Sequence, residues 1–215
     1  PRATEALGPE PTASTTTGSG PESTIPQLTA SLPVAPDEPG AGARASAAQA
    51  CAKRALDALD KKDASGLAAL AHPERGIRFT PFGIVDSKRD VVLHTAELKR
   101  AFSDPTVRTW GHMGESDQRI RMTFSQYRDR FLYDRDYAKL RAAQPDTTDT
   151  FEGRIWNVAA IRDALREAYA DGTGSEYRSP PPKGDDLDWR VLRVICAPHD
   201  GNHYVVGIIS NEWTP

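Results

Sequence analysis

The sequence lacks most of the patterns that assign a chain to a functional class. No apolar run approaches the length of a membrane-spanning helix, so no transmembrane segment is predicted. There is no phosphate-binding glycine loop, no dinucleotide-binding glycine pattern and no serine-nucleophile motif, so no nucleotide-dependent or serine-hydrolase chemistry is predicted. Lys and Arg number 27 against 30 Asp and Glu, a formal net charge of −3. This balance argues against a nucleic-acid partner.

Cysteine is scarce, with two residues in the chain. Cys51 lies on the apolar face of a predicted helix and Cys196 lies in a predicted strand. If both are buried near each other in an oxidising compartment, they form a disulfide that closes a long loop. The alternative is two buried free thiols that act as small hydrophobic side chains. The sequence leaves both open.

Clustered metal ligands are also missing. His199 and His203 have the spacing of a helical zinc pair, but Asp200-Gly201 between them predicts a turn, and no third ligand is apparent. The acidic residues of "KGDDLDW" lack the glycine and distal glutamate of a calcium loop. We therefore predict no metal ion and no cofactor.

Residues 1–43 are rich in Pro, Gly, Ser, Thr and Ala and contain almost no periodic apolar content. Such a segment cannot bury enough apolar surface to offset its ordering entropy, which predicts a disordered tether. Residues 44–215 are predicted to form one globular domain. The chain begins at Pro1 without an initiator Met, and its first segment resembles the arm that follows the lipidated cysteine of mature bacterial lipoproteins. We therefore expect an exported, envelope-tethered protein with any lipid anchor preceding this chain.

Hydrophobic periodicity and capping residues predict helices, strands and one long loop in the domain. The expected helices are 45–62, 65–71, 95–102, 123–133 and 157–172, the expected strands are 76–82, 105–113, 187–197 and 203–210, and the expected loop is 138–154.

The last two strands form a predicted hairpin, because Asp200-Gly201 suits a two-residue turn with positive φ at both central positions. Both faces of this hairpin are apolar, which predicts a central place in the sheet. The turn implies the pairs Cys196 with Val205, Val194 with Gly207, and Leu192 with Ile209.

The order of these elements predicts the α+β class. Helices come first, mixed elements follow, and a long hairpin comes last. A bent antiparallel sheet packed with helices satisfies this order. The cone of the nuclear-transport-factor-like or ketosteroid-isomerase-like folds is one such arrangement.

Two stretches, "TWGHMGESDQRIRMTFSQYRDRFLYDRDY" and "YVVGIISNEWT", together with "HPERGIRFTPF", carry a family resemblance. They are similar to an uncharacterised family of bacterial exported proteins, many of them lipoproteins, and the likeness covers roughly residues 65–215. Met113, Glu115 and Ser116 depart from a turn that is typically richer in Gly and Asp in that family. The resemblance implies export and a single globular domain, and no chemistry.

Aromatic residues are few, yet several stand near charged residues in a way that is typical of small-ligand pockets. A carboxylate such as Glu212 or Asp134, or His72, has the chemistry of a general acid or base if aromatic groups shield it. The alternative is structural: Trp213 closes the sheet and Arg193 pairs with Glu212 across neighbouring strands. The candidate ligand-binding residues are Trp110, Tyr127, Tyr133, Asp134, Arg193 and Glu212.

These observations favour a non-catalytic, exported domain that binds a small ligand or an envelope protein in a sheet-lined cleft. One alternative is a small cofactor-independent enzyme with an acid/base carboxylate or histidine. Another is a purely structural module of the cell envelope.

Overall fold

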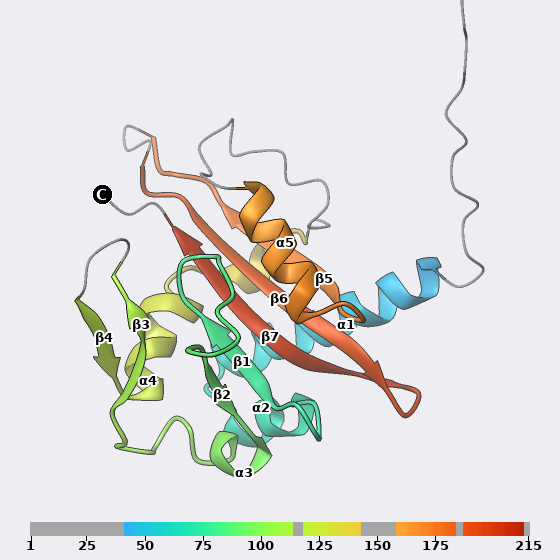
Figure 1. Cartoon of the computed structure of the whole chain (residues 1–215), viewed down its shortest axis with the longest axis horizontal. Helices are drawn as coiled ribbons and strands as arrows, with labels where there is room; N and C mark the ends of the chain where they lie inside the picture. The colour runs from blue at the N-terminus through green and yellow to red at the C-terminus, as the bar shows by residue number, and fades with distance from the viewer. Residues whose placement is uncertain (1–40, 114–117, 143–157, 184–186, 213–215) are drawn as a thin grey trace, which may run out of the picture. The chain divides into compact units, whose positions relative to one another are not determined.

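A five-stranded sheet organises the chain (Figure 1). The computed structural model describes residues 41–113, 118–142, 158–183 and 187–212, all within the compact unit Asp37–Pro215. The strand order is β2-β1-β7-β6-β5. A separate two-stranded sheet pairs β3 with β4. The strands are β1 (Ile77–Thr80), β2 (Val91–Leu93), β3 (Arg108–His112), β4 (Arg119–Met122), β5 (Thr173–Ser179), β6 (Arg190–His199) and β7 (Asn202–Glu212).

Helices cover both faces of the sheet, α1 behind it and α5 in front of it in Figure 1. Asp63 caps α2, because its side chain accepts a hydrogen bond from the backbone N–H of Gly66 at 2.9 Å. Thr123 and Gln126 form the capping box that the sequence predicts. The helical elements are α1 (Ala41–Asp60), α2 (Ala64–Leu70), α3 (Thr95–Leu98), α4 (Phe124–Tyr127), the π-helical turn η1 (Arg128–Leu132), the 3₁₀ turn η2 (Tyr137–Lys139) and α5 (Val158–Ala168).

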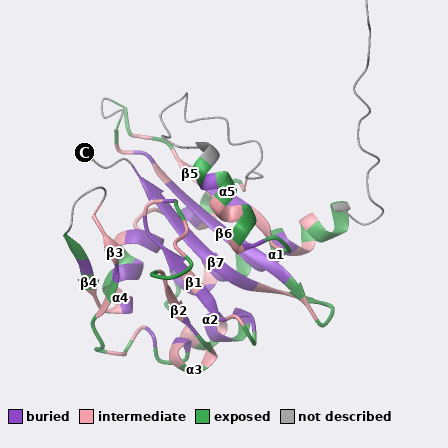
Figure 2. Ribbon diagram, viewed as in Figure 1, coloured by how far each residue is buried: buried purple, intermediate pink, exposed green. Residues whose placement is uncertain are grey.

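The face of the sheet that packs on α1, here called the α1 face, is apolar through its middle. Its strand residues include Leu192, Val194, Cys196 and Ile208, which join the α1 stripe in one large core. The middles of β6 and β7 are buried on both faces (Figure 2). This confirms the prediction that the final hairpin is central.

The opposite face, here called the α5 face, carries a smaller apolar cluster and several buried polar residues. Ile195, Ala197 and Ile209 pack against the α5 side chains and Tyr169. Thr80, Glu176, Arg193 and Asn211 are also buried on this face, alternating with the α1-face residues of the same strands. The two faces therefore differ in chemistry.

The hairpin contains a β-bulge that changes the predicted register. Cys196 pairs with Val205, as predicted, but Ile195 pairs with Gly207, so Val206 is an extra residue on β7. Both other predicted pairs are wrong by one residue, since the structure pairs Val194 with Ile208 and Leu192 with Ser210. Asp200 and Gly201 have φ of 47° and 75°, which confirms the turn.

The α+β class is confirmed, but an entirely antiparallel sheet is not. β1 runs parallel to β7, with Phe79 opposite Ile208, so the sheet is mixed. Two edge strands, β2 and β5, were not among the predicted elements. Helix α1 begins at Ala41, inside the segment predicted as a tether. The rest of that segment, residues 1–40, and most of the predicted loop 138–154 lie outside the described residues.

Candidate functional site

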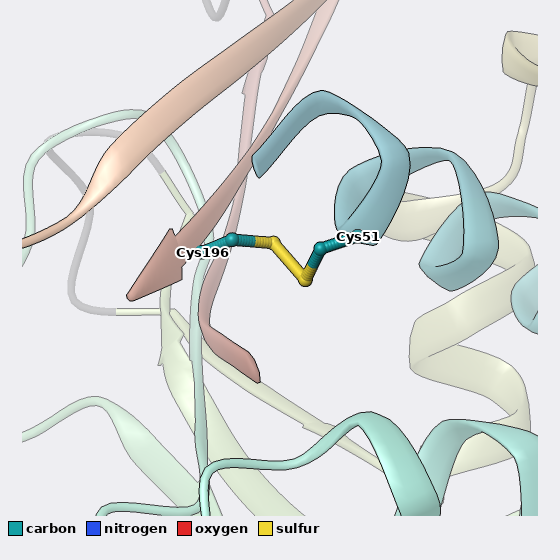
Figure 3. The surroundings of a disulfide bond; sticks show 2 residues. All are labelled: Cys51 and Cys196. Atoms are coloured by element: carbon teal, nitrogen blue, oxygen red, sulfur yellow. A yellow bond between two sulfur atoms is a disulfide. The ribbon is translucent and has the colours of Figure 1, made fainter. Parts of the chain in front are cut away.

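The two cysteines form a disulfide between α1 and β6 (Figure 3). Their Cα atoms are 6.5 Å apart, and both residues are fully buried in the α1-face core. The disulfide joins the first described helix to a central strand. Of the two alternatives that the sequence leaves open, the structure therefore shows the disulfide and not the free thiols.

Trp110 and Tyr127 belong to the core of the protein. Their rings stack with centroids 4.1 Å apart, and the indole N–H of Trp110 donates to the carbonyl oxygen of Met122 at 2.9 Å. Phe79 and Phe124 pack around them edge-on or tilted. Burial raises the pKa of Tyr127 well above its usual value. Its hydroxyl has no hydrogen-bond partner among the described residues. The stacked pair therefore supports the structural alternative, in which Trp110 and Tyr127 fill the core and do not line a ligand pocket.

Glu212, at the end of β7, is held by two arginines. Arg130 donates to both carboxylate oxygens, Nη1 to Oε2 at 2.9 Å and Nη2 to Oε1 at 2.5 Å. The Nε atom of Arg190 lies 3.0 Å from Oε2. The Glu212 residue is 8% exposed. Both oxygens of this carboxylate are therefore occupied by guanidinium donors.

Asp134 lies in the same ionic network. Its carboxylate accepts from Arg190 Nε at 3.0 Å and from the hydroxyl of Tyr137 at 3.0 Å. Asp188 extends the network, since it pairs with Arg190 at 2.9 Å and with Arg135 at 2.6 Å. This network ties η1, the following loop, β6 and β7 together. The structure thus brings Asp134 and Glu212 together as ionic partners of Arg190.

Arg193 points to the other face of the sheet. Its Nε donates to Glu176 Oε2, and Arg178 Nε donates to the other oxygen of the same carboxylate at 2.6 Å. The predicted ion pair between Arg193 and Glu212 is therefore wrong, because the bulge at Val206 places the two side chains on opposite faces. Arg193 Nη1 is buried and has no hydrogen-bond partner among the described residues.

Tyr133 directly precedes Asp134 and is partly exposed, and its ring contacts that of Tyr137. The guanidinium of Arg128 lies over its ring, 4.7 Å from the centroid. Trp213, which the sequence predicts to be buried, lies outside the described residues. The six candidate residues therefore occupy four places: an aromatic core, an ionic network, a partly exposed ring and the α5 face. They do not form one site.

His72 is buried beside His199, with their ring centroids 4.7 Å apart. Its Nδ1 accepts weak hydrogen bonds from the backbone N–H groups of Glu74 and Arg75, at 3.3 and 3.2 Å. These bonds fix the neutral tautomer with its proton on Nε2. Burial lowers the pKa of His72, and the charges of His199 and Arg75 lower it further. The unfolded state therefore binds a proton at His72 more readily than the folded state does. The protein loses stability as the pH falls below 6.5.

Asp90 was not among the acid/base candidates that the sequence indicated. It precedes β2, and its Oδ2 accepts from the hydroxyl of Thr80 at 2.5 Å and from the N–H of Asp86 at 3.0 Å. Burial raises the pKa of Asp90 to about 6, although these two hydrogen bonds and the charge of Arg78 oppose the rise. No sequence motif marks it, because its burial depends on the packing of the loop before β2.

Replacement of Asp90 by Asn is expected to stabilise the protein at pH 7.5 by about 1–2 kcal/mol, a figure reduced for solvent screening. The folded-state pKa of Asp90 is raised, so its ionisation opposes folding once the pH exceeds about 6. At pH 3.5 the wild-type carboxyl is mostly protonated in both the folded and the unfolded state, and the difference between the variants should largely disappear. Urea unfolding at the two pH values measures this. An Asp90→Asn protein that is equally destabilised at both values would contradict the expectation.

Comparison with known proteins adds no relative. No protein-family model matches the chain, and no curated protein matches it significantly. The resemblance to exported bacterial proteins therefore stays a prediction. Among the residues that the structure describes, no three His, Cys, Asp or Glu side chains are grouped to hold a metal ion. No helix in the described ranges is both long and apolar enough to cross a membrane.

Proposed function

We propose that this chain is an exported, non-catalytic domain that binds a small ligand on the α5 face of its sheet. The Cys51–Cys196 disulfide supports the location, because structural disulfides persist in oxidising compartments and are rare in the cytosol. An envelope tether ahead of the domain is part of the same proposal. The cone-type sheet also belongs to this proposal. The long antiparallel β5-β6-β7 unit, which packs on α1, supports it.

The observation that carries the binding proposal is a buried donor on the α5 face. Arg193 Nη1 is buried without a hydrogen-bond partner among the described residues. Buried polar groups are nearly always bonded, so such exceptions are typical of sites completed by a ligand or an ordered water. The same face buries charge under a helix, whereas the α1 face is apolar through its middle. A ligand with an acceptor group would satisfy this donor.

A second candidate function is acid/base catalysis, and Asp90 is the observation that favours it. Both carboxylate oxygens of Glu212 are already occupied by arginines. Asp90 has a pKa of about 6, close to the range in which general acids and bases operate. A third possibility is a purely structural envelope module. An absence of ligand binding would support it.

An NMR fragment screen tests the binding proposal with controls built into the strands. Neighbouring side chains alternate between faces, so the methyl groups of Ile195 and Ile209 report on the α5 face. The methyl groups of Val194 and Ile208 report on the α1 face. We expect fragments to shift the first set more than the second. Shifts confined to the β3–β4 hairpin, or none at all, would overturn the proposal and favour a structural module.

Export has its own test. The thiols of the protein isolated from its own cells are counted with a thiol reagent under denaturing conditions. We expect no free thiol, since both cysteines are in the disulfide. Two free thiols would show a reducing compartment and overturn the exported location.

A further inference from the structure

The ring of His72 closes the backbone turn that follows it. Its Nδ1 atom accepts from the N–H groups of Glu74 and Arg75, at 3.3 and 3.2 Å. The carbonyl oxygen of His72 accepts from the N–H of Gly76 at 2.9 Å. A side chain that accepts from the backbone two and three residues further on does the work of Asn or Asp in an Asx turn. The turn 72–76 therefore depends on an acceptor at Nδ1.

Protonation of His72 would turn this acceptor into a donor. The neutral ring carries its proton on Nε2, so the second proton of an imidazolium goes to Nδ1. The new Nδ1–H group would then face two backbone N–H groups, and neither of the two hydrogen bonds would persist. The closed turn therefore accommodates only the neutral ring.

The groups around His72 act against its protonation. The titratable groups that face His72 or its neighbour His199 are Glu74 and Arg75 of the turn, His199, Asp200 and Tyr204 of the β6–β7 hairpin, and Asp171 after α5. Burial, His199 and Arg75 lower the pKa of His72, and the two acids Glu74 and Asp171 oppose them. The open turn therefore binds the proton more readily than the closed turn, and opening is favoured as the pH falls below 6.5.

Arg75 connects this turn to the end of α5. Its Nη1 atom donates to both carboxylate oxygens of Asp171, at 2.8 and 3.0 Å, and its Nη2 atom donates to the carbonyl oxygen of Ala168 at 3.4 Å. Ala168 is the last residue of α5, so this bond satisfies one of the carbonyl groups that a helix leaves unpaired at its end. Arg75 thus binds the chain on both sides of Tyr169.

Tyr169 covers the middle of β7. A Cβ atom added to Gly207 would lie 2.5 Å from Tyr169 Oη, so the ring occupies the space that a side chain at this position would need. Tyr169 is 6% exposed and belongs to the apolar cluster of the α5 face. The bonds that Arg75 makes on both sides of Tyr169 therefore keep its ring over this face.

We propose that His72 is a proton-sensitive latch for the end of α5. When its ring takes up a proton, the turn 72–76 opens and Arg75 leaves the end of the helix. The ring of Tyr169 then loosens from Gly207 and uncovers part of the α5 face. The latch is a property of the free protein and does not rest on ligand binding.

Amide hydrogen exchange, measured by NMR at pH 7.5 and pH 5.0 and corrected for the intrinsic rate at each pH, tests the latch. The Gly76 amide reports on the turn, and the Gly172 amide, which donates to the carbonyl oxygen of Tyr169 at 2.9 Å, reports on the end of α5. In the wild-type protein we expect the protection of Gly76 to fall about tenfold at pH 5.0, because two weak hydrogen bonds are lost. The protection of Gly172 should fall about threefold, because the ion pair of Arg75 is partly exposed and contributes little. Unchanged protection of both amides would overturn the proposal.

His72→Asn and His72→Ala form a matched pair of variants. The side-chain oxygen of Asn accepts from the same backbone N–H groups and takes up no proton, so the turn should stay closed at both pH values. Ala offers no acceptor, so Gly76 should be weakly protected at both pH values. A His72→Asn protein that loses protection in acid as the wild type does would assign the effect to another group, and the latch would be wrong.

Arg75→Ala tests the connection to α5. The Arg75 side chain is 34% exposed, so this variant should stay folded. Gly76 should still respond to acid in it, whereas Gly172 should be weakly protected at both pH values. If Gly172 responds to acid in Arg75→Ala as it does in the wild type, Arg75 does not connect the turn to the helix.

Asp90 also titrates in this pH range, since burial raises its pKa to about 6. The Asp90→Asn variant therefore serves as the control, and its Gly76 amide should respond to acid as in the wild type. A response that disappears in Asp90→Asn would identify Asp90 as the sensor and overturn the role of His72.

Failure of the latch is distinguishable from failure of the proposed function. Exchange is measured without ligand, and fragment binding is measured from the methyl groups of the α5 face. If acid leaves the protection unchanged while fragments shift those methyl groups, the latch is wrong and the binding proposal stands. If acid opens the turn and no fragment binds, the latch stands and the binding proposal is wrong.

Discussion

Reduction of the Cys51–Cys196 disulfide is expected to lower the free energy of unfolding by about 4–5 kcal/mol. The cysteines are 145 residues apart, so the bond removes a large amount of conformational freedom from the unfolded chain. A domain of this size is typically stable by about 5–15 kcal/mol, and the loss is therefore a large part of the total. Both thiols would remain buried in the α1-face core after reduction, so packing changes little.

Urea unfolding of the oxidised protein, the reduced protein and a Cys51→Ala/Cys196→Ala variant measures this loss. The reduced protein and the double variant should unfold at similarly low urea concentrations. Added reductant should have no effect on the double variant, which serves as the control. If reduction leaves the midpoint of the wild-type protein unchanged, the disulfide does not contribute as expected.

Replacement of Glu212 by Ala is expected to cost about 2–4 kcal/mol. The substitution removes the carboxylate that Arg130 and Arg190 share, and it leaves the Arg190 side chain, which is only 19% exposed, with one partner fewer. The Arg130 side chain is 41% exposed and gains water, so the cost stays below that of a fully buried pair. Equilibrium unfolding measures the loss.

Two controls separate this network from ordinary surface charge. Glu212→Gln keeps the shape and one acceptor oxygen, so its cost should be smaller, about 1–2 kcal/mol. Asp57→Ala breaks the exposed pair with Lys53 on α1 and should change stability by less than about 0.5 kcal/mol. A Glu212→Ala protein as stable as Asp57→Ala would show that the network contributes nothing.

The parts of the fold that sequence predicted well are those that local chemistry determines. Asp63, Thr123 and Asp200-Gly201 each specify a cap or a turn through their own backbone neighbours. Strand β5 was missed because its central residues are Ser175, Glu176 and Tyr177, which read as polar. Two arginines, Arg178 of the same strand and Arg193 of the next, neutralise Glu176 in its buried position. The parallel pairing of β1 with β7 joins segments about 130 residues apart, which no local pattern encodes.

The bulge at Val206 separates Arg193 from Glu212, two of the six candidate residues. In the predicted register Glu212 falls on the same face of the hairpin as Arg193. One extra residue on β7 moves Glu212 opposite Arg190 and turns its side chain to the α1 face. Both Val205 and Val206 are buried and apolar, so the sequence gives no sign of which residue is extra. Asp90 and Tyr169 depend on tertiary packing and carry no motif.

The position of β7 has a consequence for how the chain acquires its structure. This strand lies at the centre of the sheet, between β1 and β6, yet it is the last strand in the sequence. The early strands β1 and β2 therefore have no central partner until β7 has been synthesised. A chain still emerging from the ribosome cannot assemble the sheet in stages from its N-terminus. Its folding is delayed until the final strand emerges, and a deletion of β7 would leave two disconnected halves.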